Sequence, residues 1–187
     1  RDWIPYEQLP ALSNPWSGYV SSANQNPVGK KYPYYLGWDY DDYERGSRIN
    51  DRLDHLDKIK FGDMQDLHMD NFNKQAELIL PFLLKQLDVE VYSGDTEAII
   101  NDLQGWNYVS DPHEKAAWVY QQWWQRIEQA IWNDELNIYG EIRKIPTRSV
   151  TARLLLRKSK LAYYDDINTP EKEGRSEIIN RAFRKTL

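Results

Sequence analysis

An asparagine at the end of a short β-prone run is the residue of this sequence best suited to chemistry. The turn-forming residues 14–18 (NPWSG) lead into Tyr19–Ala23, and Asn24 follows directly. A strand over Tyr19–Ala23 would hold the side-chain amide of Asn24 in one direction. The oxyanion of a tetrahedral transition state requires such a donor, already aimed when the charge develops. The residue types leave two interpretations, an oxyanion donor or a turn residue that caps the strand.

The order of short motifs along the chain resembles the β-subunit of the penicillin acylase family, a group of N-terminal-nucleophile amidohydrolases. The resemblance spans nearly the whole chain and no single motif carries it. The motifs, in order, are Trp3 through Leu9-Pro10, Asn14-Pro15 with Gly18-Tyr19, Ala23-Asn24, Tyr32-Pro33, Trp38, Arg45-Gly46-Ser47-Arg48-Ile49, Asp63-Met64, Asp70, Ala76, Leu80-Pro81-Phe82-Leu83-Leu84, Leu103 with Trp106, Tyr164-Asp165-Asp166 and Thr169-Pro170-Glu171-Lys172-Glu173.

The resemblance implies a mechanism and two site residues. In the family, the β-subunit begins with a serine whose hydroxyl attacks an amide carbonyl while its own α-amine acts as the base. A backbone N–H and the side-chain amide of an asparagine hold the oxyanion, and Asn24 occupies the place of that asparagine. Arg48 occupies the place of an arginine that lies beside the site in relatives and orients the catalytic groups. The alternative for Arg48 is a surface arginine that pairs with Glu44 or Asp51 at helical spacing.

The chain departs from the family pattern at its first residue, which is Arg1 and not a nucleophile. The serines near the start are internal and carry no α-amine: Ser13, Ser17, Ser21 and Ser22. We therefore expect an internal fragment of the β-subunit that is inactive by itself. Its partners would be the α-subunit and the rest of the β-subunit, and the substrate of the parent enzyme would be a small linear amide. The family resemblance also implies a periplasmic or extracellular location.

Metal binding is not indicated by the sequence. Some relatives bind a structural calcium through an aspartate just after the Tyr-Pro pair, so calcium is possible in the parent enzyme. In this chain Tyr34, Tyr35 and Leu36 follow that pair, and Asp39 and Asp41 come slightly later. We expect no cofactor in the fragment. An acidic cation site around residues 39–44 remains an alternative, although a solvated acidic turn accounts for these carboxylates more simply.

Composition excludes several other classes of protein. The 187 residues carry a formal net charge of −5, which argues against binding to nucleic-acid phosphates. The absence of cysteine removes disulfides, thiol nucleophiles and cysteine-based zinc sites. No apolar run approaches the roughly 18 residues of a transmembrane helix, so we expect no membrane association.

The first part of the chain is predicted to be an irregular arm over residues 1–43, because five prolines interrupt any helix there. One short strand is expected at Tyr19–Ala23 and a second at Val89–Tyr92. An isolated strand is not stable without partners. A lone β segment among helices therefore suggests that partner strands belong to another part of the protein, which agrees with an internal fragment.

Residues 44–187 are predicted to form a helical, bundle-like region that makes one structural unit with the arm. The class is mainly α, and the resemblance implies a helical part of the larger αββα N-terminal-nucleophile hydrolase fold. Apolar residues at helical spacing define five segments, with Pro81 expected to kink one of them. These are Ile49 to Ile59, Ala76 to Leu87, Asp95 to Leu103, a long helix after the start signal Asp111-Pro112-His113-Glu114, and a last helix opened by Thr169-Pro170-Glu171.

Two alternatives concern the aromatic residues. The long helix carries Ala116, Tyr120, Trp123, Ile127, Ala130 and Ile131 on one face. This stripe is either a packed seam between helices, which we favour, or a ligand box. At the level of the whole chain, the alternative to an acylase fragment is a stand-alone helical interaction module that binds a partner through its tyrosine-rich arm.

Overall fold

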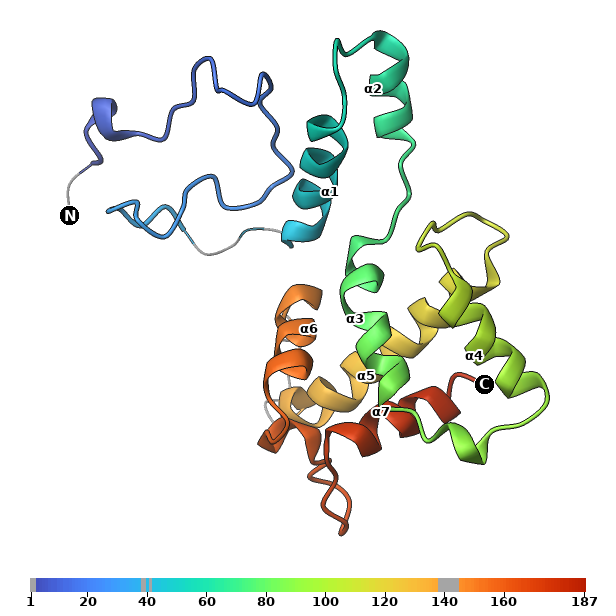
Figure 1. Ribbon diagram of the computed structural model, residues 1–187. Coiled ribbons are helices and arrows are strands. Elements are labelled where there is room, and N and C mark those ends of the chain that lie inside the picture. The colour runs from blue at the N-terminus through green and yellow to red at the C-terminus, as the bar shows by residue number, and fades with distance from the viewer. Residues whose placement is uncertain (1–2, 38–39, 41, 138–144) are drawn as a thin grey trace. The chain divides into compact units, whose positions relative to one another are not determined.

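The computed structural model describes residues 3–37, 40, 42–137 and 145–187, and these residues are mainly helical (Figure 1). The helical class predicted from the sequence is confirmed. The chain divides into two compact units, Arg1–Asp70 and Asn71–Leu187. Residues 43–44, where the sequence suggests the end of the arm, mark the start of the first α-helix of unit 1. Within the described residues, every helix is too short or too polar to span a lipid bilayer.

Unit 1 consists of the arm, a 3-10 turn η1 (Tyr6–Gln8), and two helices, α1 (Tyr43–Asp54) and α2 (Phe61–His68). The arm is irregular, as its prolines predict. The strand predicted at Tyr19–Ala23 is wrong, because no described residue pairs with this segment through its backbone. The segment is held by side-chain contacts to α1 instead, as the site geometry below describes.

Helix α1 begins earlier and ends earlier than the apolar spacing predicts. It ends at Asp54, and the chain then turns through Lys58, whose φ of 54° lies in the left-handed region. A non-glycine residue with positive φ is not compatible with a continuing α-helix. The predicted extension through Leu56 to Ile59 is therefore wrong, and Ile59 is 42% exposed.

Unit 2 contains five α-helices among its described residues. They are α3 (Lys74–Lys85), α4 (Asp95–Gly105), α5 (Lys115–Asn137), α6 (Arg148–Arg157) and α7 (Arg175–Arg184), with 3-10 turns η2 (Val89–Val91) and η3 (Ala162–Tyr164). The second predicted strand is wrong, because Val89–Val91 forms η2. α3 continues through Pro81 as one helix.

Helix α5 supplies the central part of the unit 2 core. Its aromatic stripe is buried, with Tyr120, Trp123 and Ile127 each 0% exposed. The indole Nε1 of Trp123 donates to the carbonyl oxygen of Ile179 in α7 at 3.1 Å. α5 packs against α4 and α7, and these helices share one apolar cluster with α3 and α6 (Figure 1). The stripe is a packed seam between helices, as we favoured, and not a ligand box.

Helix α5 begins after residues 111–114, which the sequence had predicted to be its first turn. Residues 111–114 form a turn, and the Asp111 carboxylate accepts a hydrogen bond from Asn71 Nδ2 at 2.8 Å. The helix begins at Lys115, where Glu114 Oε1 accepts the backbone N–H of Ala116 at 3.1 Å. The acid that binds one of the first N–H groups of the helix is therefore Glu114, three residues after Asp111.

The last helix also starts later than predicted. Thr169 donates its hydroxyl to the carbonyl oxygen of Asp166 at 3.0 Å, which makes a local turn and not a helix start. α7 begins at Arg175, and Glu177 accepts the backbone N–H of Gly174 just before it. The inward-facing residues of α7 are as predicted, since Ile178, Ile179, Ala182 and Phe183 are all buried.

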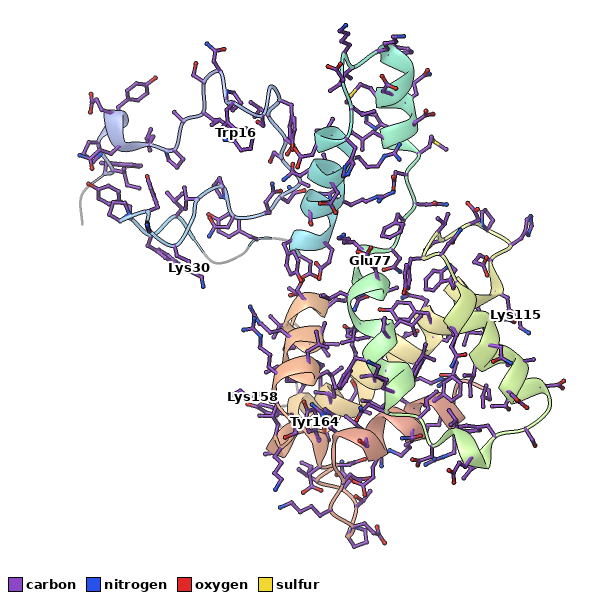
Figure 2. The ribbon with its side chains drawn as sticks, viewed as in Figure 1. Trp16, Lys30, Glu77, Lys115, Lys158 and Tyr164 are labelled. Atoms are coloured by element: carbon purple, nitrogen blue, oxygen red, sulfur yellow. The ribbon has the colours of Figure 1, made fainter. Side chains whose placement is uncertain are left out.

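The C-terminal end of α6 is closed by a buried phenol. Tyr164 donates its hydroxyl to the carbonyl oxygens of Leu154 at 3.2 Å and Lys158 at 2.9 Å (Figure 2). Burial raises the pKa of Tyr164, and the positive charge of Arg175 opposes that rise. Arg175 itself donates to the carbonyl oxygen of Leu155 at 2.8 Å. Leu154 also accepts the backbone N–H of Lys158 at 2.9 Å. The side chains of Tyr164 and Arg175 thus add partners for the carbonyls at the end of the helix.

Candidate functional site

The predicted site residues both lie in unit 1, on or against helix α1. Residues 19–25 run along one face of this helix and contact it through Tyr19, Ser21 and Gln25. The Tyr19 hydroxyl donates to Asp54 Oδ1 at 2.6 Å, and the Ser21 hydroxyl donates to Asn50 Oδ1. Positions 50 and 54 are four residues apart and therefore lie on the same side of the helix. The last turns of α1 thus hold the first half of the segment.

The second half of the segment approaches α1 closely. A Cβ at Gly46 would lie 3.0 Å from the Oε1 atom of Gln25, so the glycine makes room for this amide. The backbone N–H of Ala23 donates to the same Oε1 atom at 2.6 Å, and Ala23 is only 4% exposed. Gly46 is four residues before Asn50 and continues the same face. A glycine in α1 is therefore explained by close packing and not by a turn.

Electrostatics strengthen the contact between Tyr19 and α1. The hydrogen bond to Asp54 is the main cause of a raised pKa for Tyr19, with smaller effects of desolvation and of the Asp54 and Asp51 charges. A carboxylate stabilises the protonated phenol because it accepts a hydrogen bond from the hydroxyl, and it destabilises the phenolate because the two negative charges repel each other.

Asn24 is exposed, and its side-chain oxygen is engaged. Arg45 donates from Nη2 to Asn24 Oδ1. The backbone of Asn24 has a φ of 63°, which is a left-handed conformation that asparagine adopts more readily than most residues. Because the guanidinium occupies the oxygen side of the amide, the two N–H donors of Nδ2 lie on the side away from Arg45. The amide has a defined direction without a neighbouring strand.

Asn26 is a second amide with a similar arrangement, and the sequence analysis did not single it out. Its Oδ1 atom accepts the backbone N–H of Val28 at 3.0 Å. This is an Asx-type turn, in which the side chain binds the backbone two residues later. The signal that could have identified it is the Asn-Pro pair at residues 26–27, which is typical of such turns.

Arg48 pairs with Asp70, the last residue of unit 1. Arg48 Nε lies 3.0 and 3.1 Å from the two carboxylate oxygens, and Nη2 lies 2.7 Å from Oδ2. The sequence had suggested Glu44 or Asp51 as the partner at helical spacing. It did not predict Asp70, which follows the next helix, α2. Nor did it predict that Arg45, three residues before Arg48, would be the arginine that contacts Asn24.

The described residues supply an amide donor and two arginines but not a nucleophile with its base. Ser17 donates its hydroxyl to the carbonyl oxygen of Tyr19 at 3.1 Å, and Ser21 is bound to Asn50. Both serines are inside the chain, so neither has an α-amine that could serve as its base. This arrangement can stabilise negative charge but cannot by itself form an acyl-enzyme.

No metal site is evident in the part of the chain that the structure describes. It contains no group of three or more His, Cys, Asp or Glu side chains that could hold an ion. Asp39 and Asp41, considered above for calcium, lie outside the described residues. The possibility of calcium in the parent enzyme stays a prediction.

Comparison with known proteins gives two results. The family model for penicillin amidase matches residues 1–187, which is the whole chain. The penicillin acylase 2 proenzyme of Pseudomonas sp. (strain SE83) is 28% identical over 153 residues, or 82% of this chain. The matched region is 17% of the length of that relative, so the chain spans under a fifth of it.

Proposed function

The chain belongs to the penicillin amidase family, and we propose that it forms part of an amidohydrolase acting on non-peptide C–N bonds. The substrate class comprises the side-chain amide of a β-lactam, an acyl-homoserine lactone or a similar linear amide. The name of the Pseudomonas relative supports an acylase activity. In this proposal the nucleophile is an N-terminal serine of the β-subunit that is not in this chain, and the isolated chain is inactive. The helices described above are then a part of the αββα hydrolase fold.

The arrangement of Asn24 is the observation that supports this function best. Arg45 donates to the amide oxygen, so that the N–H donors of Asn24 face away from Arg45 at an exposed position. A donor that is already oriented costs no reorganisation when charge develops on the substrate oxygen. The bound guanidinium also withdraws electrons from the amide, which makes its N–H groups better donors.

The proposed reaction uses Asn24 in its first step. The serine hydroxyl attacks the amide carbonyl, and its α-amine accepts the hydroxyl proton. The carbonyl oxygen becomes an oxyanion, to which Asn24 Nδ2 donates a hydrogen bond. The α-amine then gives its proton to the departing amine, and an acyl-enzyme remains. Water hydrolyses this ester through a second tetrahedral oxyanion that the same amide stabilises.

The remainder of the parent protein is the proposed partner of this chain. The arm exposes large apolar side chains that no described residue covers: Trp3 is 96% exposed and Trp16, labelled in Figure 2, is 100% exposed. Large aromatic side chains are enriched where protein surfaces meet, so their exposure in the arm supports a contact with another part of the protein. In the Pseudomonas relative the matched region is 17% of the length, so that protein has further sequence that could contact the corresponding segment. We propose a periplasmic or extracellular location, as the resemblance implies.

Replacement of Asn24 by alanine in the full-length protein tests the proposal. We expect turnover of a chromogenic amide to fall by about 10²- to 10³-fold, the usual effect of losing one oxyanion donor. Asn24→Gly is the second variant, because glycine keeps the left-handed backbone and removes only the amide. Both variants should lose turnover to a similar extent.

Asn26→Ala is the matched comparison, since it removes a neighbouring amide whose oxygen is also engaged. A large loss in this variant with little loss in Asn24→Ala would move the donor to Asn26 and contradict our assignment. The 187-residue chain alone provides a separate test. Amide hydrolysis by this chain, abolished by Asn24→Ala, would contradict the proposal that its nucleophile lies elsewhere.

A further inference from the structure

Three arginines form a row along helix α1. Arg45, Arg48 and Arg52 follow one another at spacings of three and four residues, which places them on one side of the helix. Cβ atoms at these spacings are about 5–6 Å apart, so the three positive charges repel one another. The row therefore needs an acidic partner to keep its members in defined positions.

Asp70 is that partner, and it binds Arg48 most closely. Both of its oxygens face Arg48, at 3.0 Å and 3.1 Å from Nε, and Nη2 lies 2.7 Å from Oδ2. Arg52 is a weaker contact, with its Nε atom 3.5 Å from Oδ2. A two-pronged contact between a carboxylate and a guanidinium fixes the plane of the guanidinium as well as its position. Asp70 thus fixes both the position and the orientation of the Arg48 guanidinium. Arg52 contributes a second positive charge near the same carboxylate.

Burial makes this contact stronger than an ordinary surface ion pair. The side chain of Asp70 is 9% exposed, against 25% for Arg48 and 40% for Arg52. Charges away from solvent interact more strongly because water screens them less. Loss of Arg48 would leave the largely buried carboxylate of Asp70 with the longer contact to Arg52, at 3.5 Å.

The pair lies one helical turn from the contact between Arg45 and Asn24. Arg45 donates to the amide from its place three residues before Arg48. The two-pronged contact with Asp70 occupies the guanidinium of Arg48. Arg45 is the arginine of the row that contacts the amide of Asn24.

We propose that Asp70 is a positioning residue for the amidohydrolase reaction, acting through Arg48 and the arginine row. This inference rests on the proposed function. Asp70 contacts no reacting atom in this proposal. It fixes the orientation of Arg48 from a position 22 residues further along the chain, and so leaves Arg45 as the arginine that holds the amide of Asn24.

Kinetics of Asp70→Asn in the full-length protein test the inference. We expect kcat to fall by about 10²-fold with little change in KM, because a small displacement of a catalytic group lowers turnover more than binding. Asp70→Glu keeps the charge on a longer side chain and should recover part of the loss. Asp66→Asn, an exposed position in α2, removes the same charge as a matched control and should leave kcat unchanged.

A double variant separates positioning from general stability. If Asp70 acts through Arg48, Arg48→Gln with Asp70→Asn should be no slower than Arg48→Gln alone. Additive losses, or an unchanged kcat in folded Asp70→Asn, would overturn the inference. If Asp70→Asn does not fold, the kcat of Asp70→Glu becomes the test. A kcat equal to that of the wild-type protein would then overturn the inference.

Failure of the proposed function gives a different pattern. An enzyme that hydrolyses no amide would overturn both proposals. Loss of activity in Asn24→Ala together with normal kcat in Asp70→Asn would overturn this inference alone.

Discussion

At Asn24, two separate properties of asparagine are used at once. The backbone requires a residue that tolerates a φ of 63°, and the side chain requires an oxygen that can accept from Arg45. Aspartate would satisfy both, but it would offer no N–H donor on its other side. The candidate site thus depends on the amide in particular, and on the arginine that orients it.

Substitution of Arg45 tests that orientation at the scale of the residue. Arg45→Met keeps most of the side-chain length and removes the guanidinium, so that the amide of Asn24 can rotate. We expect kcat of the full-length protein to fall by about 10-fold or more while KM changes little, because orientation and not substrate binding is lost. Arg184→Met, at an exposed position in α7, is the matched control and should leave both constants unchanged. An equal effect in the two variants would contradict the role of Arg45.

At the scale of the element, helix α1 supports the segment of residues 19–25, for which the sequence had predicted partner strands. Its residues Gly46, Asn50 and Asp54 lie at intervals of four and meet the segment at three points. The backbone N–H groups of a helix interior are already paired internally, so the helix cannot form a β ladder with the segment. The segment is therefore held mainly by side-chain hydrogen bonds and is not a strand.

Substitution Tyr19→Phe tests the contact at the end of α1. The pKa of Tyr19 is raised in the folded protein, so its contribution to stability is complete at pH values below the ordinary pKa of about 10. It is lost as the pH rises through the raised folded-state value. Denaturant unfolding from pH 8 to pH 12 should show a decrease in the wild-type protein that is smaller in Tyr19→Phe. Parallel curves for the two proteins would contradict the contact.

At the scale of the whole molecule, the two units differ in how they are held together. Unit 2 has a continuous apolar core with two tryptophans, Trp123 and Trp124, that are 0% exposed. Unit 1 buries few apolar side chains, with Ala23 and Leu53 the buried ones among its described residues. Its order depends on polar contacts to α1 and on the pair between Arg48 and Asp70.

Two tryptophans of α5 provide a paired test of the unit 2 core. Trp123→Ala should lower the free energy of unfolding by about 3–5 kcal/mol, because it opens a cavity and removes a buried hydrogen-bond donor. Trp118→Ala changes the same residue type at a position that is 61% exposed and should change stability by less than about 0.5 kcal/mol. Chemical denaturation followed by circular dichroism measures both. Similar losses in the two variants would contradict the assignment of the core.

The helical class, the buried helix faces and the family resemblance could all be predicted from local patterns of residues. Apolar residues at helical spacing are a local property, so the inner faces of α3, α5 and α7 could be predicted from Ile79, Trp123 and Ile178. Helix starts were less predictable, because Asp111 and Thr169 had other hydrogen-bond partners available once the chain had folded.

The acceptor of each arginine, by contrast, became known from the folded arrangement of unit 1. Arg45 and Arg48 have the same chemistry and lie three residues apart, so no local pattern could assign one to Asn24 and the other to Asp70. These acceptors are 21 and 22 residues away along the chain, and folding alone brings them to α1. The strand at Tyr19–Ala23 was mispredicted for a related reason, since a strand needs a partner that its own sequence does not contain.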